Sequence, residues 1–165
     1  MPVHPPFSPS SSRPPFIVST PSSTYRPGGV LTVMVEAETN SSSDFQGFLL
    51  QARSGSGDAV MWPVGKFTNI NSSQFTALHC QNQQNSTVSQ ATGAKKKKIQ
   101  VSWEAPNSGN YGDIYFSVTV VQNYPTFWVG INSSPVRLDS SSGADSVLCS
   151  TALLFISLLS LLDYC

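Results

Sequence analysis

Hydrophobic residues alternate with polar ones in five stretches of the chain between residues 30 and 131. A period of two is typical of a strand that buries one face, because successive side chains point to opposite sides. The residues predicted to face inward are Leu31, Val33, Val35 and Ala37; Phe48, Leu50 and Ala52; Ile99, Val101 and Trp103; Ile114, Phe116, Val118 and Val120; and Phe127, Val129 and Ile131.

Weaker strands are expected over Ala59–Val64, Gln74–Cys80 and Thr87–Gln90. Glycine, asparagine, serine and proline interrupt the alternating stretches about every 8–12 residues, and no window before the C-terminal tail has a helical period. The pattern therefore predicts an all-β fold, an immunoglobulin-like antiparallel β-sandwich.

Composition divides the chain into four parts. Residues 1–24 contain seven prolines and seven serines, which predicts an extended arm that buries little. The sandwich is expected over residues 25–138, opening with a turn at Tyr25-Arg26-Pro27-Gly28-Gly29, where glycine suits the second corner of a type II turn. A polar spacer over 139–146 and a hydrophobic tail over 147–162 complete the chain.

The tail is predicted to be a short hydrophobic helix that attaches the protein to a membrane. Its 16 uncharged residues fall short of the roughly 20 that a membrane-spanning helix needs. Small residues from Ser140 to Ala144 before a hydrophobic terminus favour a GPI-attachment signal. A short transmembrane anchor and an alternatively spliced or truncated reading frame are the other interpretations.

The charge content of the chain argues against some partners and favours an extracellular setting. Charged residues make up 11% of the sequence, against roughly 25% in average globular proteins, and the net charge is zero. No overall field therefore attracts nucleic acid. Sequons for N-glycosylation at Asn40, Asn71, Asn85 and Asn132 are typical of a secreted or cell-surface protein.

Catalytic and metal-binding signals are weak. The sequence has no nucleophile elbow, zinc-protease motif or phosphate loop. His79-Cys80 is the only adjacent pair of soft ligands, and the other histidine, His4, lies in the predicted arm. A metal site needs three or four ligands, so we predict no cofactor, no metal and no enzymatic activity.

Two features are candidate ligand contacts. The run Lys95, Lys96, Lys97 and Lys98 could bind a sulphated glycan or an anionic lipid, or it could be a solvated turn that protects a strand end. Trp128 alternates opposite to Phe127 and Val129, so it is expected to lie either between a sheet and a loop or at the surface, and it is a candidate to contact a ligand.

Several motifs resemble the Reeler (reelin N-terminal) domain family from residue 1 to about 138. In order they are Met1-Pro2-x-His4, Tyr25-x-Pro27-Gly28, Phe45-x-Gly47-Phe48-Leu49-Leu50-Gln51-Ala52-Arg53, Gly65-x-Phe67, Cys80, Val101-x-Trp103-x-Ala105-Pro106, and Phe116-x-Val118-Thr119-Val120-Val121-Gln122 with Phe127-Trp128. Within the family, the chain is most similar to the Reeler region of ferric-chelate reductase-like proteins and to Reeler-only defence proteins.

The resemblance implies a disulfide. Family members usually have a signal peptide and a cysteine just before the segment that matches Met1-Pro2-x-His4, and that cysteine pairs with the one matching Cys80. The partner of Cys80 is therefore expected upstream of Met1, which makes Met1 an internal methionine. The missing cross-link would lower the stability of the 165-residue form by roughly 2–4 kcal/mol.

Three functions follow as hypotheses. The first is a non-catalytic extracellular recognition module, tethered or secreted, that binds a microbial surface polymer, another glycan or a protein in innate immune defence. The second is a truncated or alternative product of a ferric-chelate reductase-like protein that lacks the haem-binding domains. The third is a matrix or adhesion component that binds sulphated glycans.

Overall fold

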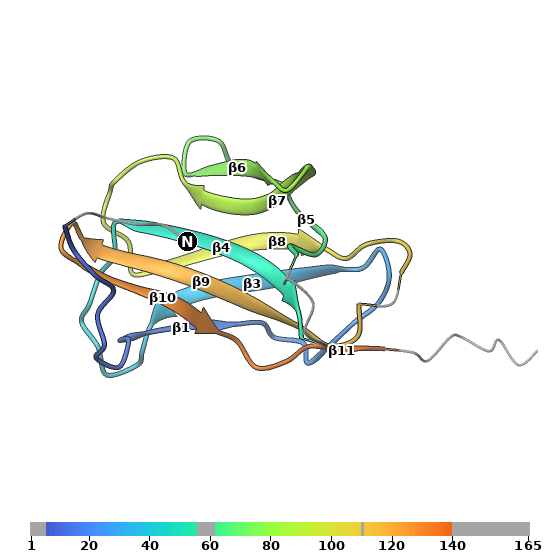
Figure 1. The fold of residues 1–165 in the computed structure, drawn as a ribbon, viewed down its shortest axis with the longest axis horizontal. Helices are drawn as coiled ribbons and strands as arrows, with labels where there is room; N and C mark the ends of the chain where they lie inside the picture. The colour runs from blue at the N-terminus through green and yellow to red at the C-terminus, as the bar shows by residue number, and fades with distance from the viewer. Residues whose placement is uncertain (1–5, 56–61, 110, 140–165) are drawn as a thin grey trace, which may run out of the picture.

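Two antiparallel sheets pack face to face in a computed structural model that describes residues 6–55, 62–109 and 111–139 (Figure 1). The strands are β1 (Phe16–Ser19), β2 (Thr24–Tyr25), β3 (Val30–Ala37), β4 (Gly47–Ser54), β5 (Lys66–Thr68), β6 (Phe75–Cys80), β7 (Gln83–Gln90), β8 (Lys98–Glu104), β9 (Ile114–Asn123), β10 (Thr126–Asn132) and β11 (Arg137–Leu138). The predicted all-β sandwich is confirmed.

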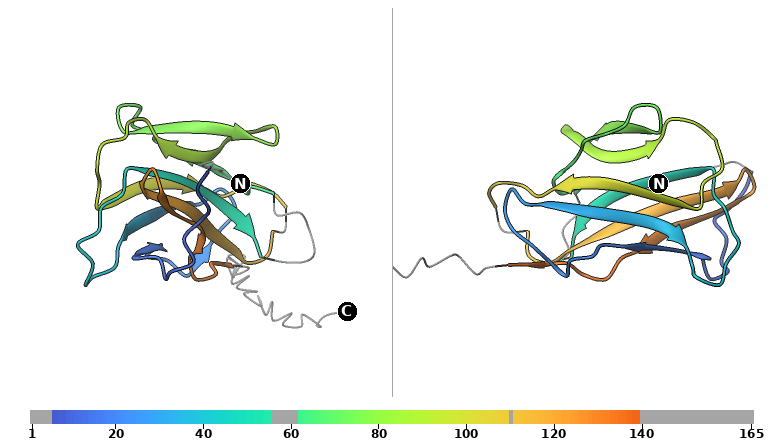
Figure 2. Two further views of the ribbon diagram at one scale, coloured as in Figure 1. Left: turned by 60° about the vertical axis from the view of Figure 1, so that its left-hand side comes forward. Right: turned by 180° about the vertical axis from the view of Figure 1, so that it is seen from behind.

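The four-stranded sheet has the order β1-β3-β8-β5, and the five-stranded sheet has the order β10-β9-β4-β7-β6. A short parallel pair of β11 and β2 lies beside them. The five-stranded sheet faces the viewer in Figure 1, and the reverse view in Figure 2 brings β3 of the other sheet forward.

The core lies between the two sheets, at the positions that the alternation predicts. Trp103 is fully buried, its ring centroid lies 5.3 Å from that of Phe116, and its indole nitrogen donates to the carbonyl oxygen of Val64 over 2.8 Å. Because tryptophan has a polar nitrogen, this hydrogen bond allows the large ring to be buried without an unpaired donor. Val33 on β3 and Leu50 on β4 are also fully buried.

Part of the predicted N-terminal arm forms a strand of the sandwich, where an extended arm that buries little was expected. Phe16–Ser19 form β1, which pairs with β3 and buries Phe16 and Val18. The composition of residues 1–24 concealed this strand because it has only four residues between prolines and serines.

The last long strand breaks the predicted alternation. Trp128 faces Val120 and Ile131 faces Val118, with a register shift between them at Gly130, whose φ is +69°. The extra residue of this bulge brings Trp128 and Ile131 to the same face, the core side. Val129, which was predicted to face inward, instead lines the outer surface.

Only the end of the strand expected over Ala59–Val64 falls within the described residues. Residues 56–61 lie outside the described residues, and Pro63 makes only an isolated bridge to Arg53. The strand of this region, β5, begins at Lys66 and pairs with β8. Proline removes a ladder donor, which explains why pairing starts only after Gly65.

The predicted spacer and tail, from residue 140 onward, lie outside the described residues. In the part of the chain that the structure describes, no helix has the length and hydrophobicity to cross a membrane.

Candidate functional site

The outer faces of the two sheets differ in charge. On the four-stranded sheet, Lys98 on β8 lies 3.0 Å from Glu36 on β3, and Lys66 on β5 lies 3.1 Å from Glu104 on β8. Both are directly opposed cross-strand pairs. Exposed ion pairs of this kind add little stability, but each pair neutralises the charges of its own two residues on this face.

The five strands of the other sheet contain a single charged residue, Arg53 on β4, among lysine, arginine, aspartate and glutamate. The alternation that buries one face of this sheet turns amides, hydroxyls and a tyrosine to the other. A groove of about 690 Å³ crosses this outer face. Its lining includes Gln51 and Arg53 from β4, Tyr115, Ser117 and Thr119 from β9, Asn132 from β10 and Cys80 from β6.

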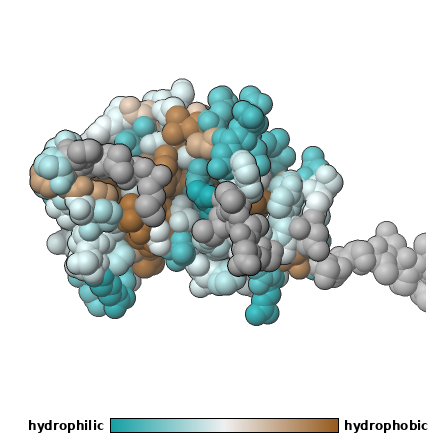
Figure 3. Space-filling model, viewed as in Figure 1, coloured by the Kyte–Doolittle hydropathy of each residue, from teal (hydrophilic) through white to brown (hydrophobic). Residues whose placement is uncertain are grey.

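A second hollow of about 360 Å³ continues the groove toward the β9–β10 turn. The two share Leu49 and Thr119, and the second adds Phe48, Val121 and Tyr124. Figure 3, from the side of the five-stranded sheet, shows hydrophobic patches across the middle of the visible face and the most hydrophilic surface at the β6–β7 turn. The groove therefore runs from a polar end to a more apolar end.

A chain of hydrogen bonds fixes the polar end of the groove. Arg53 donates to Oε1 of Gln51, Nε2 of Gln51 donates to Oγ1 of Thr87 over 2.5 Å, and Thr87 donates to Sγ of Cys80 over 3.1 Å. Gln51 and Thr87 are buried. Because each group orients the next across β4, β7 and β6, the polar lining is ordered without a ligand.

Cys80, expected from the resemblance to be one half of a disulfide, has a free thiol and is half-buried in the groove. Its expected partner upstream of Met1 lies outside the sequence, so the pairing stays a prediction. Nδ1 of His79 accepts a hydrogen bond from the backbone nitrogen of Asn85 over 3.1 Å. The described residues contain no group of three metal-binding side chains.

Three of the four lysines in the run 95–98 have partners close by. Lys95 lies 3.4 Å from Asp44, and Lys98 pairs with Glu36. Lys96 donates to the carbonyl oxygens of Gln46, Thr92 and Ala94. Burial lowers the pKa of the Lys96 ammonium below its ordinary value of 10.5. Lys97 is exposed, so the run presents much less free charge than its sequence suggests.

Trp128 is not exposed, so the prediction that it contacts a ligand was wrong; it takes the other expected position, between the sheet and the N-terminal segment. Its side chain is 6% exposed, its ring packs edge-on against Phe16 at 5.6 Å, and its indole nitrogen donates to the carbonyl oxygen of Ser12 over 3.1 Å. The bulge at Gly130 explains the error, since it shifts the alternation by one residue.

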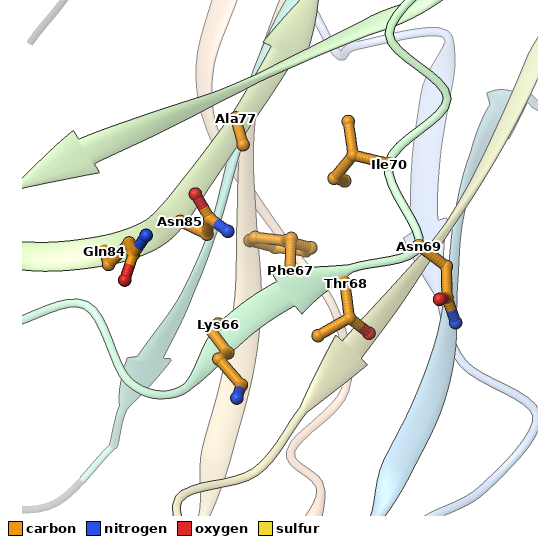
Figure 4. Close-up of a pocket in the computed structure, with 8 residues that line it drawn as sticks. All are labelled: Lys66, Phe67, Thr68, Asn69, Ile70, Ala77, Gln84 and Asn85. Atoms are coloured by element: carbon orange, nitrogen blue, oxygen red, sulfur yellow. The ribbon is translucent and has the colours of Figure 1, made fainter.

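The four sequons lie in different surroundings. Asn40, Asn71 and Asn132 are exposed, and Asn132 also lines the groove. Asn85 is half-buried and lines a separate pocket of about 390 Å³ between β5 and the β6–β7 hairpin. Figure 4 shows the amide of Asn85 turned toward Phe67 of β5.

Comparison with known proteins assigns the fold to a family. The sequence pattern described as the Reeler domain matches residues 1–144. The chain belongs to the Reeler domain family.

Two kinds of relative share this Reeler domain. The chain is 40% identical over 120 residues to ferric-chelate reductase 1 of Bos taurus, covering 73% of the chain and 19% of the relative. It is 34% identical over 132 residues to a protein of Antheraea mylitta whose name describes it as a defense protein, covering 79% of each. The chain thus spans about a fifth of the reductase relatives that it matches.

Solved structures agree with the Reeler fold. The human F-spondin Reeler domain superposes with a TM-score of 0.63 at 20% identity, covering 80% of this chain and 94% of that one. Neither this fold nor a linear motif identifies the groove, because its residues come from four strands, β4, β6, β9 and β10. The signal that could have found it is that Arg53 is the only charged residue in the strands of this sheet.

Proposed function

We propose that the chain is a non-catalytic extracellular recognition module that holds its ligand in the groove of the five-stranded sheet. The observation that carries this proposal is the ordered polar chain from Arg53 to Cys80 on a face with almost no charge. A preordered polar site loses little conformational entropy on binding.

The lining favours a neutral, hydroxyl-rich ligand over a strongly charged one. Amides and hydroxyls such as Gln51, Ser117 and Asn132 can both donate and accept hydrogen bonds, as a sugar requires. The ring of Tyr115 offers an apolar surface for the carbon face of a sugar. A microbial surface polymer fits these properties, and the defense name of the moth relative supports a role in innate immunity.

The described lining residues of the groove supply neither histidine nor carboxylate, so the thiol of Cys80 has no general base beside it. Its hydrogen-bond partner is the hydroxyl of Thr87. Nucleophilic chemistry at a thiol is usually activated by an adjacent base, so this arrangement supports binding without turnover.

A matched pair of variants tests the groove. Ser117→Trp places an indole in the groove from β9, and Ser102→Trp places one on the outer face of the four-stranded sheet from β8. We expect the wild type and S102W to be retained on intact bacteria and purified wall polymers, and S117W to lose retention. Equal retention of the two variants, with both folded by circular dichroism, would contradict a site in the groove.

A second candidate function is that of the Reeler module within a ferric-chelate reductase-like protein. The 40% identity to the bovine reductase over its Reeler region favours it. In that case the module would bind beside the reductase parts and would not reduce iron alone. The two candidates separate on an affinity test, because only the first requires binding to microbial polymers.

Membrane attachment through residues 147–162 and binding of sulphated glycans to the lysine run stay predictions. Release of the protein from cells by a phosphatidylinositol-specific phospholipase would support the GPI signal. Replacement of Lys97 with alanine should reduce retention on heparin if the run binds sulphated glycans, since Lys97 is its exposed cation.

A further inference from the structure

Three of the four edge strands of the sandwich are protected from pairing with another chain. β1 is four residues long and follows Pro14 and Pro15, and β5 has only three residues. β10 is interrupted by the bulge at Gly130, and its Phe127 carbonyl already accepts a hydrogen bond from Ser10. Short strands, prolines, bulges and covering segments are the usual devices by which proteins protect sheet edges.

Among the described residues, none of these devices protects the fourth edge, β6. Its six residues, Phe75–Cys80, contain no proline, glycine, lysine or acidic residue. No lysine, arginine, aspartate or glutamate occurs anywhere between residues 69 and 94. The β6–β7 hairpin is irregular, but the irregularity lies on the inner strand β7 and not on β6. Three residues of β7 lie between the partner of Leu78 and the partner of Cys80. Leu78 is 37% exposed at the centre of this edge.

A sequon lies at the start of β6. The carbonyl oxygen of Asn71 accepts a hydrogen bond from the backbone of Phe75, the first residue of β6, over 2.9 Å. Oδ1 of Asn71 accepts from both the backbone nitrogen and the hydroxyl of Ser73. This turn holds the exposed Asn71 in place, and a glycan on its Nδ2 would extend beside the beginning of the strand.

Another sequon lies beside the end of β6. The backbone nitrogen of Asn85 donates to His79, and the Asn85 side chain shares its pocket with Ala77 of β6. The φ of Asn85 is +54°, a conformation that asparagine tolerates better than most residues. Figure 4 shows this amide in the opening between β7 and β5, so a first sugar on Asn85 would lie in that opening.

We propose that N-glycans on Asn71 and Asn85 protect β6 from pairing with a second copy of this chain. An uncharged antiparallel edge can pair with itself about a two-fold axis, which makes a second copy the natural competitor. A hydrated, branched glycan on Asn71 would stand at the start of the strand, and one on Asn85 would extend from the opening beside its end. Together they prevent that approach and take the place of the short strands, prolines and bulge that protect the other three edges. The proposal rests on the extracellular setting of the proposed function, because N-glycans are added to chains that enter the secretory pathway.

The experiment uses the protein secreted from insect cells behind a cleavable signal peptide. The variant S73A/N85G removes the two sequons beside β6 without adding charge, and glycine keeps the positive φ at residue 85. The control S42A/S134A removes the sequons of Asn40, which follows β3, and of Asn132 on β10, the opposite edge strand of the five-stranded sheet. Mass spectrometry reports the glycans, and light scattering after size exclusion reports the oligomeric state.

We expect the wild type and the control to be monomers and S73A/N85G to form dimers that increase with concentration. Adding Leu78→Lys to S73A/N85G supplies a charge at the centre of the edge and should restore the monomer. A monomeric S73A/N85G, a dimer that persists with L78K, or a secreted wild type without glycans at Asn71 and Asn85 would overturn the proposal. Because this measurement needs no ligand, failure to bind microbes would contradict only the proposed function.

Discussion

The indole nitrogen of Trp128 lies 3.1 Å from the carbonyl oxygen of Ser12, so β10 holds a segment 116 positions earlier in the chain. The same ring packs against Phe16 of β1 at 5.6 Å. One side chain thus joins the N-terminal segment to the core across the edge where the two sheets meet.

Replacing Trp128 should therefore destabilise the fold. We expect Trp128→Phe to lower the free energy of unfolding by about 1–2 kcal/mol through loss of the hydrogen bond, and Trp128→Ala by about 3–5 kcal/mol because it also leaves a cavity. Urea denaturation measures both. Trp62→Phe is the matched control, since Trp62 is half exposed and its replacement should change stability by less than about 0.5 kcal/mol.

Gly65 cannot accept a side chain. Its φ is +67°, and a Cβ atom there would lie 2.7 Å from the ring of Trp103 and would also meet the carbonyl oxygen of Glu104. Strain and overpacking together predict a loss of about 2–5 kcal/mol for Gly65→Ala, measured by thermal or urea unfolding. Gly93→Ala, where nothing lies within 4 Å, should be close to neutral. Equal effects of the two substitutions would contradict this interpretation.

The hydroxyl of Thr87 should matter more than its methyl group. Thr87→Val leaves Nε2 of the buried Gln51 without its acceptor, which predicts a loss of about 1–3 kcal/mol and weaker ligand binding. Thr87→Ser keeps the hydroxyl, and also the sequon of Asn85, and should retain binding. The comparison combines urea denaturation with the retention assay on wall polymers. If T87V and T87S behave alike, the hydrogen-bond chain does not order the groove.

Tyr25 makes stability depend on alkaline pH. Burial, with smaller effects of Asp113 and Tyr111, raises the pKa of its phenol above the ordinary value of 10.0, and the hydroxyl donates to the carbonyl oxygen of Gly112 over 2.7 Å. Above pH 10 the unfolded chain loses this proton before the folded one, so the stabilisation present below pH 10 falls as the pH rises.

Urea denaturation at pH 8 and pH 11 measures this dependence. Tyr25→Phe should be less stable than the wild type by about 1 kcal/mol at pH 8, and the difference should shrink or reverse at pH 11. A constant difference across this range would show that Tyr25 does not cause the pH dependence. Tyr124→Phe is a suitable control, because Tyr124 is 61% exposed.

The sequence predicted those strands whose hydrophobic residues alternate over a full length. Val33 and Val35 on β3 and Phe116 and Val118 on β9 are buried as expected, because the period of two directly determines which face enters the core. The sequence did not reveal the bulge at Gly130, because a single inserted residue depends on pairing with β9 and not on local composition. Trp128 was misplaced for that reason.

The groove could not be predicted from any single segment. Gln51, Ser117 and Thr87 are 30 or more positions apart along the chain, and the register of β4 with β9 and β7 brings them together. Thr87 and Ser86 are fully buried although both are polar. A hydrophobic pattern does not register buried polar residues, so the strand that it predicted was shorter than β7. Only the register of the strands shows that these residues share one surface.

The near absence of charge on the five-stranded sheet has a consequence for where such a module can work. Dissolved ions screen attraction between charges but hardly affect hydrogen bonds and apolar contact within a groove. With Arg53 as the only charged residue of these strands, affinity should change little between dilute and strongly saline fluids. A binding surface of this kind would keep its affinity when the salt concentration of a body fluid changes. A surface built on lysine and arginine would bind more weakly as the salt concentration rises.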